Sequence, residues 1–216
     1  MSNFYQKDYF SARAVNRNFM AYENDAKFIN DSIDSSGSIL DYGCGEMLFT
    51  KYLEQCYSDV YVFDPSFAIK SMNDYGNRFK EDPGDFKYDA ICLRGVLQHL
   101  PTPFFTVSKL IDKKLKKNGY LIFLATPNMI SPYYLINRTL PALVTELNFW
   151  VPSTNELEKV MSNYNMKHVN TTYPYLNSGY ARPVNDHIRF LINLFGIKTK
   201  YPFWFSMFNS IYQKEY

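Results

Sequence analysis

Residues 38–45 read Ser38-Ile39-Leu40-Asp41-Tyr42-Gly43-Cys44-Gly45, a short apolar run that ends in a carboxylate and a glycine-rich turn. A helical stripe follows the turn, made of Leu48, Phe49, Tyr52, Leu53 and Cys56. The β-branched and aromatic run Val60-Tyr61-Val62-Phe63 comes next and is stopped by Asp64-Pro65. This order predicts a strand, a turn, a helix and a second strand, which together make one βαβ unit.

Strands and helices continue to alternate beyond this unit. The expected strands are 78–80, 88–93, 120–125, 169–173 and 207–213, and the expected helices are 68–73, 104–117 and one that opens with the capping box Ser153-Thr154-Asn155-Glu156. Such alternation with short turns is typical of an α/β protein, in which helices cover both faces of an open, mostly parallel sheet. We therefore expect a Rossmann-like sheet.

The chain length of 216 residues favours a single domain, 1–216, with elaborations. Apolar residues at helical spacing predict one or two N-terminal helices within 1–37. The segments 128–151 and 176–206 interrupt the alternation of strands and helices. Because ligands of open α/β sheets bind beyond the carboxyl ends of the strands, we expect these two insertions to form a cap over an acceptor pocket.

Charge and cysteine usage exclude several classes of protein. Lys and Arg number 23 against 21 Asp and Glu, a net charge of +2, which is too small for a typical nucleic-acid-binding surface. Cys44, Cys56 and Cys92 are widely spaced and have no neighbouring histidine cluster, so neither disulfides nor a metal site is predicted. Residues 1–10 lack the apolar run of a signal peptide, and 120–136 contains prolines unsuited to a spanning helix. We expect a cytoplasmic protein without stable membrane insertion.

The first turn and the second strand suit a nucleoside with a positive charge. Asp41 precedes the turn, and Asp64 lies 21 residues after Gly43, where a carboxylate accepts hydrogen bonds from ribose hydroxyls. A dinucleotide fingerprint would carry a third glycine where this chain has Leu48, and Asp41 would repel a pyrophosphate.

The sequence resembles the class I S-adenosylmethionine-dependent methyltransferases over residues 38–128. The resemblance is carried by Asp41-Tyr42-Gly43-Cys44-Gly45, by Phe63-Asp64-Pro65-Ser66, by Tyr88-Asp89-Ala90-Ile91 through Gln98-His99-Leu100-Pro101, and by Leu115-Lys116-Lys117-Asn118-Gly119-Tyr120-Leu121-Ile122-Phe123. It implies an antiparallel last strand and S-adenosylmethionine as cofactor. The turn Thr126-Pro127-Asn128 and the aromatic C-terminal half are similar to bacterial methyltransferases that act on sugars or other small surface-glycan precursors.

The resemblance also implies roles for single residues. Asp41 and the backbone of Gly43, Cys44 and Gly45 would hold the methionine end of the cofactor. Asp64, with Pro65 beside it, would hold the ribose. Arg94 and Gly95 would line the sulfonium side. Apart from the resemblance, Tyr9, near the start of the chain, is a candidate to close over the cofactor's carboxylate, and a solvated helix position is the alternative for it. These residues are all present in the sequence.

A hydroxyl acceptor must lose a proton, and histidine suits that work at neutral pH. His99 follows the fourth expected strand, 88–93, and His187 lies in the second insertion, 176–206. These two histidines are the candidate catalytic bases. His168, before the sixth strand, ranks below them. Each histidine also has a structural alternative: His99 could be packed at the start of a helix, and His187 could be an exposed helical residue. If neither is the base, a carboxylate such as Asp186 could remove the proton, or proximity alone could carry the step.

The predicted activity is methyl transfer to a small-molecule acceptor, foremost a hydroxyl of a sugar or surface-glycan precursor. N-methylation of an amino sugar or natural product is one alternative, and a non-catalytic S-adenosylmethionine-binding protein is another. The tyrosines and phenylalanines of the C-terminal region could also form a homodimer interface or a membrane-surface patch.

Overall fold

The fold is described from a computed structural model of the chain. The structure describes residues 19–34, 36–65, 80–131, 134–135, 138, 149–173, 195 and 207–215.

A seven-stranded sheet forms the centre of the molecule, in the order β3-β2-β1-β4-β5-β7-β6. Its strands are β1 (Ser38–Tyr42), β2 (Asp59–Phe63), β3 (Lys80–Glu81), β4 (Tyr88–Arg94), β5 (Leu115–Pro127), β6 (Met166–Thr172) and β7 (Met207–Lys214). β1 pairs in parallel with β2 and β4, and β4 with β5, whereas β7 runs antiparallel to both β5 and β6. The predicted fold class, a mostly parallel sheet with an antiparallel last strand, is confirmed.

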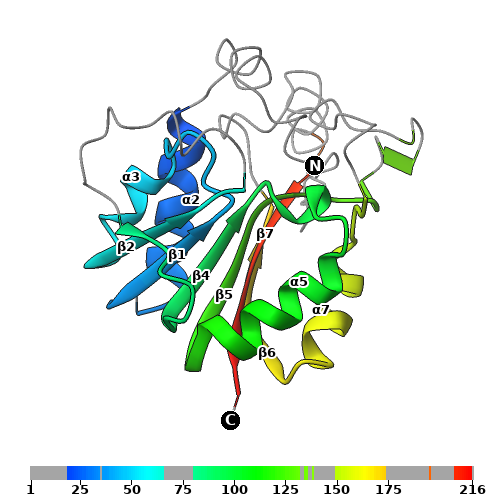
Figure 1. The fold of residues 1–216 in the computed structure, drawn as a ribbon. Coiled ribbons are helices and arrows are strands. Elements are labelled where there is room, and N and C mark those ends of the chain that lie inside the picture. Colours follow the sequence, from blue (N-terminus) through cyan, green and yellow to red (C-terminus); the bar gives the residue numbers. More distant parts are fainter. Residues whose placement is uncertain are drawn as a thin grey trace.

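Helices cover both faces of this sheet (Figure 1). α2 (Phe19–Ser32) and α3 (Thr50–Leu53) pack on one face, while α5 (Pro103–Lys109), the π-helical turn Leu110–Lys114 and α7 (Thr154–Ser162) pack on the other. Successive residues of a strand point to opposite faces. Ile39 accordingly joins the core under α2 and α3, and Leu40 joins the core under α5 and α7.

The predicted capping box opens α7. The Ser153 side chain accepts a hydrogen bond from the Glu156 backbone at 3.2 Å, and the Glu156 carboxylate accepts one from the Ser153 N–H at 2.8 Å. Two backbone donors at the helix start are thereby satisfied. Leu157 and Met161 then lie buried on the side that faces the sheet.

The passage from helix into strand differs from the sequence expectation of a helix at 104–117 and a strand at 120–125. α5 ends at Lys109, and β5 begins at Leu115, which pairs with Tyr88 of β4. Between Leu115 and Tyr120 the pairing shifts register, and Asn118 has a left-handed backbone with φ of 59°. The buried Leu115 therefore belongs to a bulged strand rather than to the helical stripe that its spacing suggested.

The expected helix after the first turn is also shorter than its apolar stripe. Turns occupy most of 43–49, and α3 covers four residues. Of the segment 1–37, α2 is the helix that the structure describes, and residues 1–18 lie outside the described part. Most of 128–151 and, apart from Phe195, all of 176–206 lie outside it as well. The single-domain boundaries and the cap therefore stay predictions.

The described residues contain no group of three or more His, Cys, Asp or Glu side chains able to hold a metal ion. Among the helices of this part of the chain, none combines the length and the apolar character that a membrane span requires.

Candidate active site

The glycine-rich turn after β1 is bonded to the end of β2. The N–H groups of Gly43 and Cys44 donate to the Phe63 carbonyl at 2.6 and 3.3 Å. The next N–H, that of Gly45, donates to the Asp64 carboxylate at 2.7 Å. Three successive backbone donors thus bring the two predicted anchors, the turn and Asp64, to the same edge of the sheet.

Gly43 occupies a position that no other residue fits. Its φ is 82°, a left-handed conformation in which glycine carries no steric penalty. A Cβ atom at this position would also lie 2.5 Å from a methyl carbon of Val96, in the loop that follows β4. The missing side chain therefore allows close approach between the turn and the β4 loop.

Asp41 is a buried carboxylate at the end of β1, on the face that α2 and α3 cover. The Thr50 hydroxyl at the start of α3 donates to it at 2.6 Å. Burial raises the pKa of Asp41 from 3.8 to about 6, against opposing contributions from the Thr50 hydrogen bond and the Arg94 charge. This electrostatic arrangement favours a cationic ligand over an anionic one.

Cys44 contributes its backbone to the turn rather than a reactive thiol. Burial, with smaller contributions from the charges of Asp41 and Asp64, raises the pKa of its thiol far above the ordinary value. The thiol therefore stays protonated at neutral pH and is a poor nucleophile.

Arg94 ends β4, and its side chain lies on the α2 face of the sheet. Its Nε donates to the Asp25 carboxylate of α2 at 2.9 Å, and its guanidinium lies 4.3 Å from the centre of the Tyr22 ring. The following residue, Gly95, has a φ of 64° and donates its N–H to the Leu124 carbonyl of β5 at 2.8 Å. The main chain of β4 therefore turns at the sheet edge, whereas the Arg94 side chain joins a polar network beneath α2.

That network continues to β7 and was not foreseen from the sequence. The Asn209 side-chain amide donates to Asp25 at 2.8 Å, and its carbonyl accepts the Ala125 N–H at 2.8 Å, where the pairing of β5 with β7 is interrupted. Burial raises the pKa of Asp25, opposed by Arg94 and Asn209. The sequence contained one signal that Asp25 is buried. Asp25 lies four residues after Ala21 and three before Phe28, so all three share the buried side of α2.

The loop after β4 carries the histidine predicted as a base. Leu97–His99 forms a single 3₁₀ turn, in which Gln98 is buried and His99 is half-buried. The Gln98 side-chain nitrogen lies 3.0 Å from the Gly95 carbonyl and 3.2 Å from His99 Nε2. The Phe149 N–H donates to the Gln98 backbone carbonyl at 2.8 Å, so the end of the first predicted insertion lies against this loop.

Comparison with known proteins identifies the family. Residues 8–192 match the model of a family described as a methyltransferase domain. This chain belongs to that methyltransferase family. No curated protein sequence matches it. The enzyme is an S-adenosylmethionine-dependent methyltransferase, as its motifs predicted.

Solved structures share its fold at low sequence identity. An S-adenosylmethionine-dependent methyltransferase from Archaeoglobus fulgidus is 14% identical, with a TM-score of 0.66 over 97% of this chain and 100% of that one. A chain of the complex between the Haloferax volcanii Trm112 activator and a methyltransferase is 10% identical, with a TM-score of 0.66 over 97% of each chain. The magnesium protoporphyrin IX methyltransferase of Synechocystis, solved with SAH, is 18% identical, with a TM-score of 0.57 over 100% of this chain and 89% of that one.

The described residues of the methyltransferase fit its cofactor. The buried carboxylate of Asp41 suits a cationic ligand, Gly43 leaves room at the backbone, and Asp64 is held in place by the Gly45 N–H. Pro65 follows Asp64 and is exposed. Tyr9 and His187 lie outside the described residues, so nothing in the structure bears on them. The individual cofactor contacts stay predictions.

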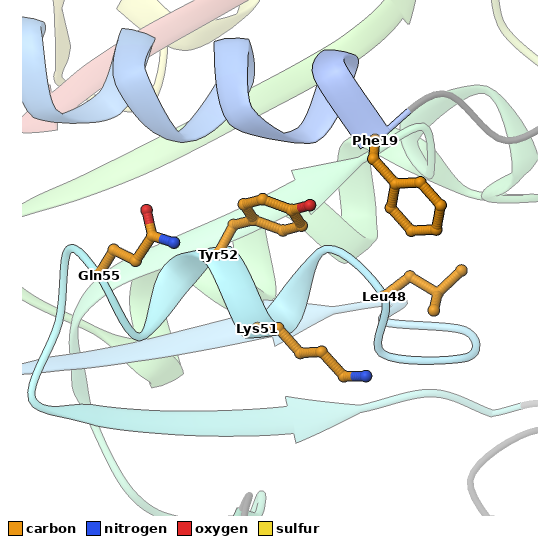
Figure 2. A pocket seen from close by; sticks show the side chains of 5 residues that line it. All are labelled: Phe19, Leu48, Lys51, Tyr52 and Gln55. Atoms are coloured by element: carbon orange, nitrogen blue, oxygen red, sulfur yellow. The ribbon is translucent and has the colours of Figure 1, made fainter.

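A separate pocket of about 280 Å³ lies between α2 and α3 (Figure 2). Phe19 and Leu48 line one end, and Tyr52, Lys51 and Gln55 extend along α3. None of the residues predicted to bind the cofactor lines this pocket. The site predicted from the sequence, at the carboxyl ends of β1, β2 and β4, is thus distinct from this pocket.

The Asp41→Asn variant should gain stability at neutral pH. Because the pKa of Asp41 is raised to about 6 in the folded protein, its ionisation costs stability. That cost is absent below the ordinary pKa of about 3.8 and is complete above the folded value. Urea unfolding at pH 7.5 should show a gain of about 1–3 kcal/mol, whereas the difference should vanish near pH 4.

Asp112→Asn, which removes an exposed carboxylate before β5, is the matched control and should change the unfolding free energy at pH 7.5 by less than about 0.5 kcal/mol. A stability of Asp41→Asn that is equal to or below that of the wild type at pH 7.5 would contradict the assignment. The affinity of Asp41→Asn for S-adenosylmethionine should fall, because this variant lacks the carboxylate that attracts a cationic ligand.

The Asp64→Ala variant should bind S-adenosylhomocysteine more weakly. Removing charge-assisted hydrogen bonds to the ribose should cost about 1.5–3 kcal/mol, or roughly tenfold to 150-fold in affinity by calorimetry. The loss of the Gly45 contact would add to this effect. Asp112→Ala again serves as control. Tighter binding of NAD than of S-adenosylhomocysteine by the wild type would exclude the proposed ligand.

Proposed function

We propose that this methyltransferase transfers a methyl group to a hydroxyl of a sugar or surface-glycan precursor in the cytoplasm. The observation that carries the acceptor assignment is the hydrogen bond from the Phe149 N–H to the Gln98 carbonyl at 2.8 Å. It brings two aromatic residues, Phe149 and Trp150, beside the loop that bears His99. Aromatic faces and a polar edge together suit a small polyhydroxylated ligand.

The aromatic residues near this loop are partly accessible to a ligand. Phe149 is 55% exposed, and the half-buried Trp150 packs on Phe104 of α5 with ring centres 4.8 Å apart. Both lie at the end of the insertion 128–151, which we propose, together with 176–206, as the acceptor cap of a single domain spanning 1–216.

The chain's own residues would act by orientation and by proton removal. The cofactor supplies an electrophilic methyl group when bound. Holding an acceptor in line with it can account for about 7–11 kcal/mol of the barrier. We propose that His99, which ends the 3₁₀ turn after β4, takes the hydroxyl proton, with His187 as the second candidate; a positioned base typically contributes about 10²–10⁴-fold.

The solved relatives are compatible with a small acceptor. The Synechocystis structure is that of a magnesium protoporphyrin IX methyltransferase, so the acceptor in its name is a porphyrin. Such a molecule is neither protein nor nucleic acid, which supports the proposed class of acceptor but not the particular atom.

Mass spectrometry of a cell extract incubated with isotopically labelled S-adenosylmethionine tests this proposal. We expect the label on an oxygen of a sugar nucleotide or a related precursor, and less of this product with the Asp64→Ala variant at a cofactor concentration that does not saturate it. Label on nitrogen would favour the amino-sugar or natural-product alternative. A methylated protein or nucleic acid as the only labelled product would overturn the proposal.

A further inference from the structure

Gln98 lies between the backbone of the site and the candidate base. It follows β4 by four residues and is 6% exposed. Its side-chain nitrogen is within hydrogen-bond distance of two acceptors, the Gly95 carbonyl at 3.0 Å and His99 Nε2 at 3.2 Å. A primary amide has two N–H groups, so both bonds can form at once.

The direction of the bond to His99 follows from the chemistry of the amide. An amide nitrogen donates and does not accept, so Gln98 must be the donor and the lone pair of His99 Nε2 the acceptor. Flipping the amide would place its oxygen against the Gly95 carbonyl, an oxygen that can only accept. The contact with Gly95 thus fixes the amide, and the amide fixes the imidazole with its proton on Nδ1.

The other end of the same amide, the Gln98 side-chain oxygen Oε1, is buried. No group of the described residues donates to Gln98 Oε1. A buried acceptor left in this condition destabilises the free protein, and this destabilisation disappears when a ligand supplies a donor. Hydroxyl and amino groups of a methyl acceptor are such donors.

We infer that Gln98 is a positioning residue of the methyl-transfer site, which holds His99 as the Nδ1–H tautomer through Nε2 and binds an O–H or N–H group of the methyl acceptor through Oε1. The second half of this inference rests on the proposed function. It has a mechanistic consequence: the lone pair of His99 that would take the acceptor's proton is engaged by Gln98, so the base becomes available only when this bond is exchanged for one to the acceptor.

The tautomer is tested by NMR of the full chain carrying ¹⁵N-labelled histidine at pH 8.5, with the His99 signals assigned by their loss in His99→Ala. We expect the wild type to show a protonated Nδ1 and an unprotonated Nε2. In Gln98→Glu a carboxylate replaces the donor, and the proton should move to Nε2. In Gln98→Met the preference should be lost. A wild-type proton on Nε2, or no change in either variant, would overturn the tautomer assignment.

Binding of the acceptor by Oε1 is tested with the labelled-methyl reaction. Raising the amount of the small-molecule fraction of the extract at fixed enzyme gives an apparent KM, which Gln98→Met should raise tenfold or more. Its affinity for S-adenosylhomocysteine should stay within about twofold. An unchanged apparent KM would refute this half of the inference. If no small molecule is labelled, the proposed function fails while the NMR result stands on its own.

Discussion

The Asp25→Ala variant is expected to lose about 3–5 kcal/mol of unfolding free energy, because removing one partner of a buried ion pair strands the other charge. Asp25 is 1% exposed and accepts hydrogen bonds from Arg94 and Asn209. Without it, the Arg94 guanidinium keeps its charge under α2 with its carboxylate partner gone. Urea unfolding at pH 7.5 measures the loss.

Asp31→Ala removes an exposed carboxylate from the same helix and should change stability by less than about 0.5 kcal/mol. A double-mutant cycle that adds Arg94→Ala should recover part of the loss, because the stranded charge is then absent. A loss below about 1 kcal/mol in Asp25→Ala, or strict additivity in the cycle, would show that the pair contributes little to stability.

The His99→Ala variant is expected to lower kcat for methyl transfer by about 10²–10⁴-fold if His99 is the base. Its affinity for S-adenosylhomocysteine should stay nearly unchanged, because Asp64 and the glycine-rich turn do not depend on the imidazole. The rate of label transfer to the product found in the extract, at saturating cofactor, measures the effect.

His168→Ala is the matched control. His168 lies on β6, at the far edge of the sheet order, where its Nε2 is 2.8 Å from the Thr171 hydroxyl. The His168→Ala variant should have a kcat within a few fold of the wild-type value. His187→Ala is measured in parallel as the alternative base. If both His99→Ala and His187→Ala stay within a few fold of the wild type, orientation alone or a carboxylate such as Asp186 must carry the step.

The strands near the cofactor site could be predicted because their pattern is local. β1, β2 and β4 are short runs of apolar residues bounded by turns or charges, and all three lie at the expected positions. The predicted start of β5 was wrong by five residues. Leu115 would be buried whether it belonged to the preceding helix or to β5, so the spacing of apolar residues could not distinguish a helix from a strand at this position.

The candidate site was predictable in its motifs and not in its polar network. The turn at Gly43 and the carboxylate of Asp64 are separated by a fixed length of strand and helix, so their spacing in sequence indicates their proximity. Asp25 and Asn209 are 184 residues apart, and no local pattern connects them. Their contact depends on where β7 enters the sheet, which is a property of the whole topology.

The position of β7 between β5 and β6 also constrains the order in which the protein can assemble. β6 has no partner in the described sheet other than β7, although it precedes β7 in the chain. During synthesis, β6 must therefore wait beside an incomplete sheet until residues 207–214 have left the ribosome. Asn209 reaches Ala125 and Asp25 in that same late step. Closure of the sheet and formation of the Asn209–Asp25 hydrogen bond are thus coupled, which favours slow, cooperative folding over gradual growth from the N-terminus.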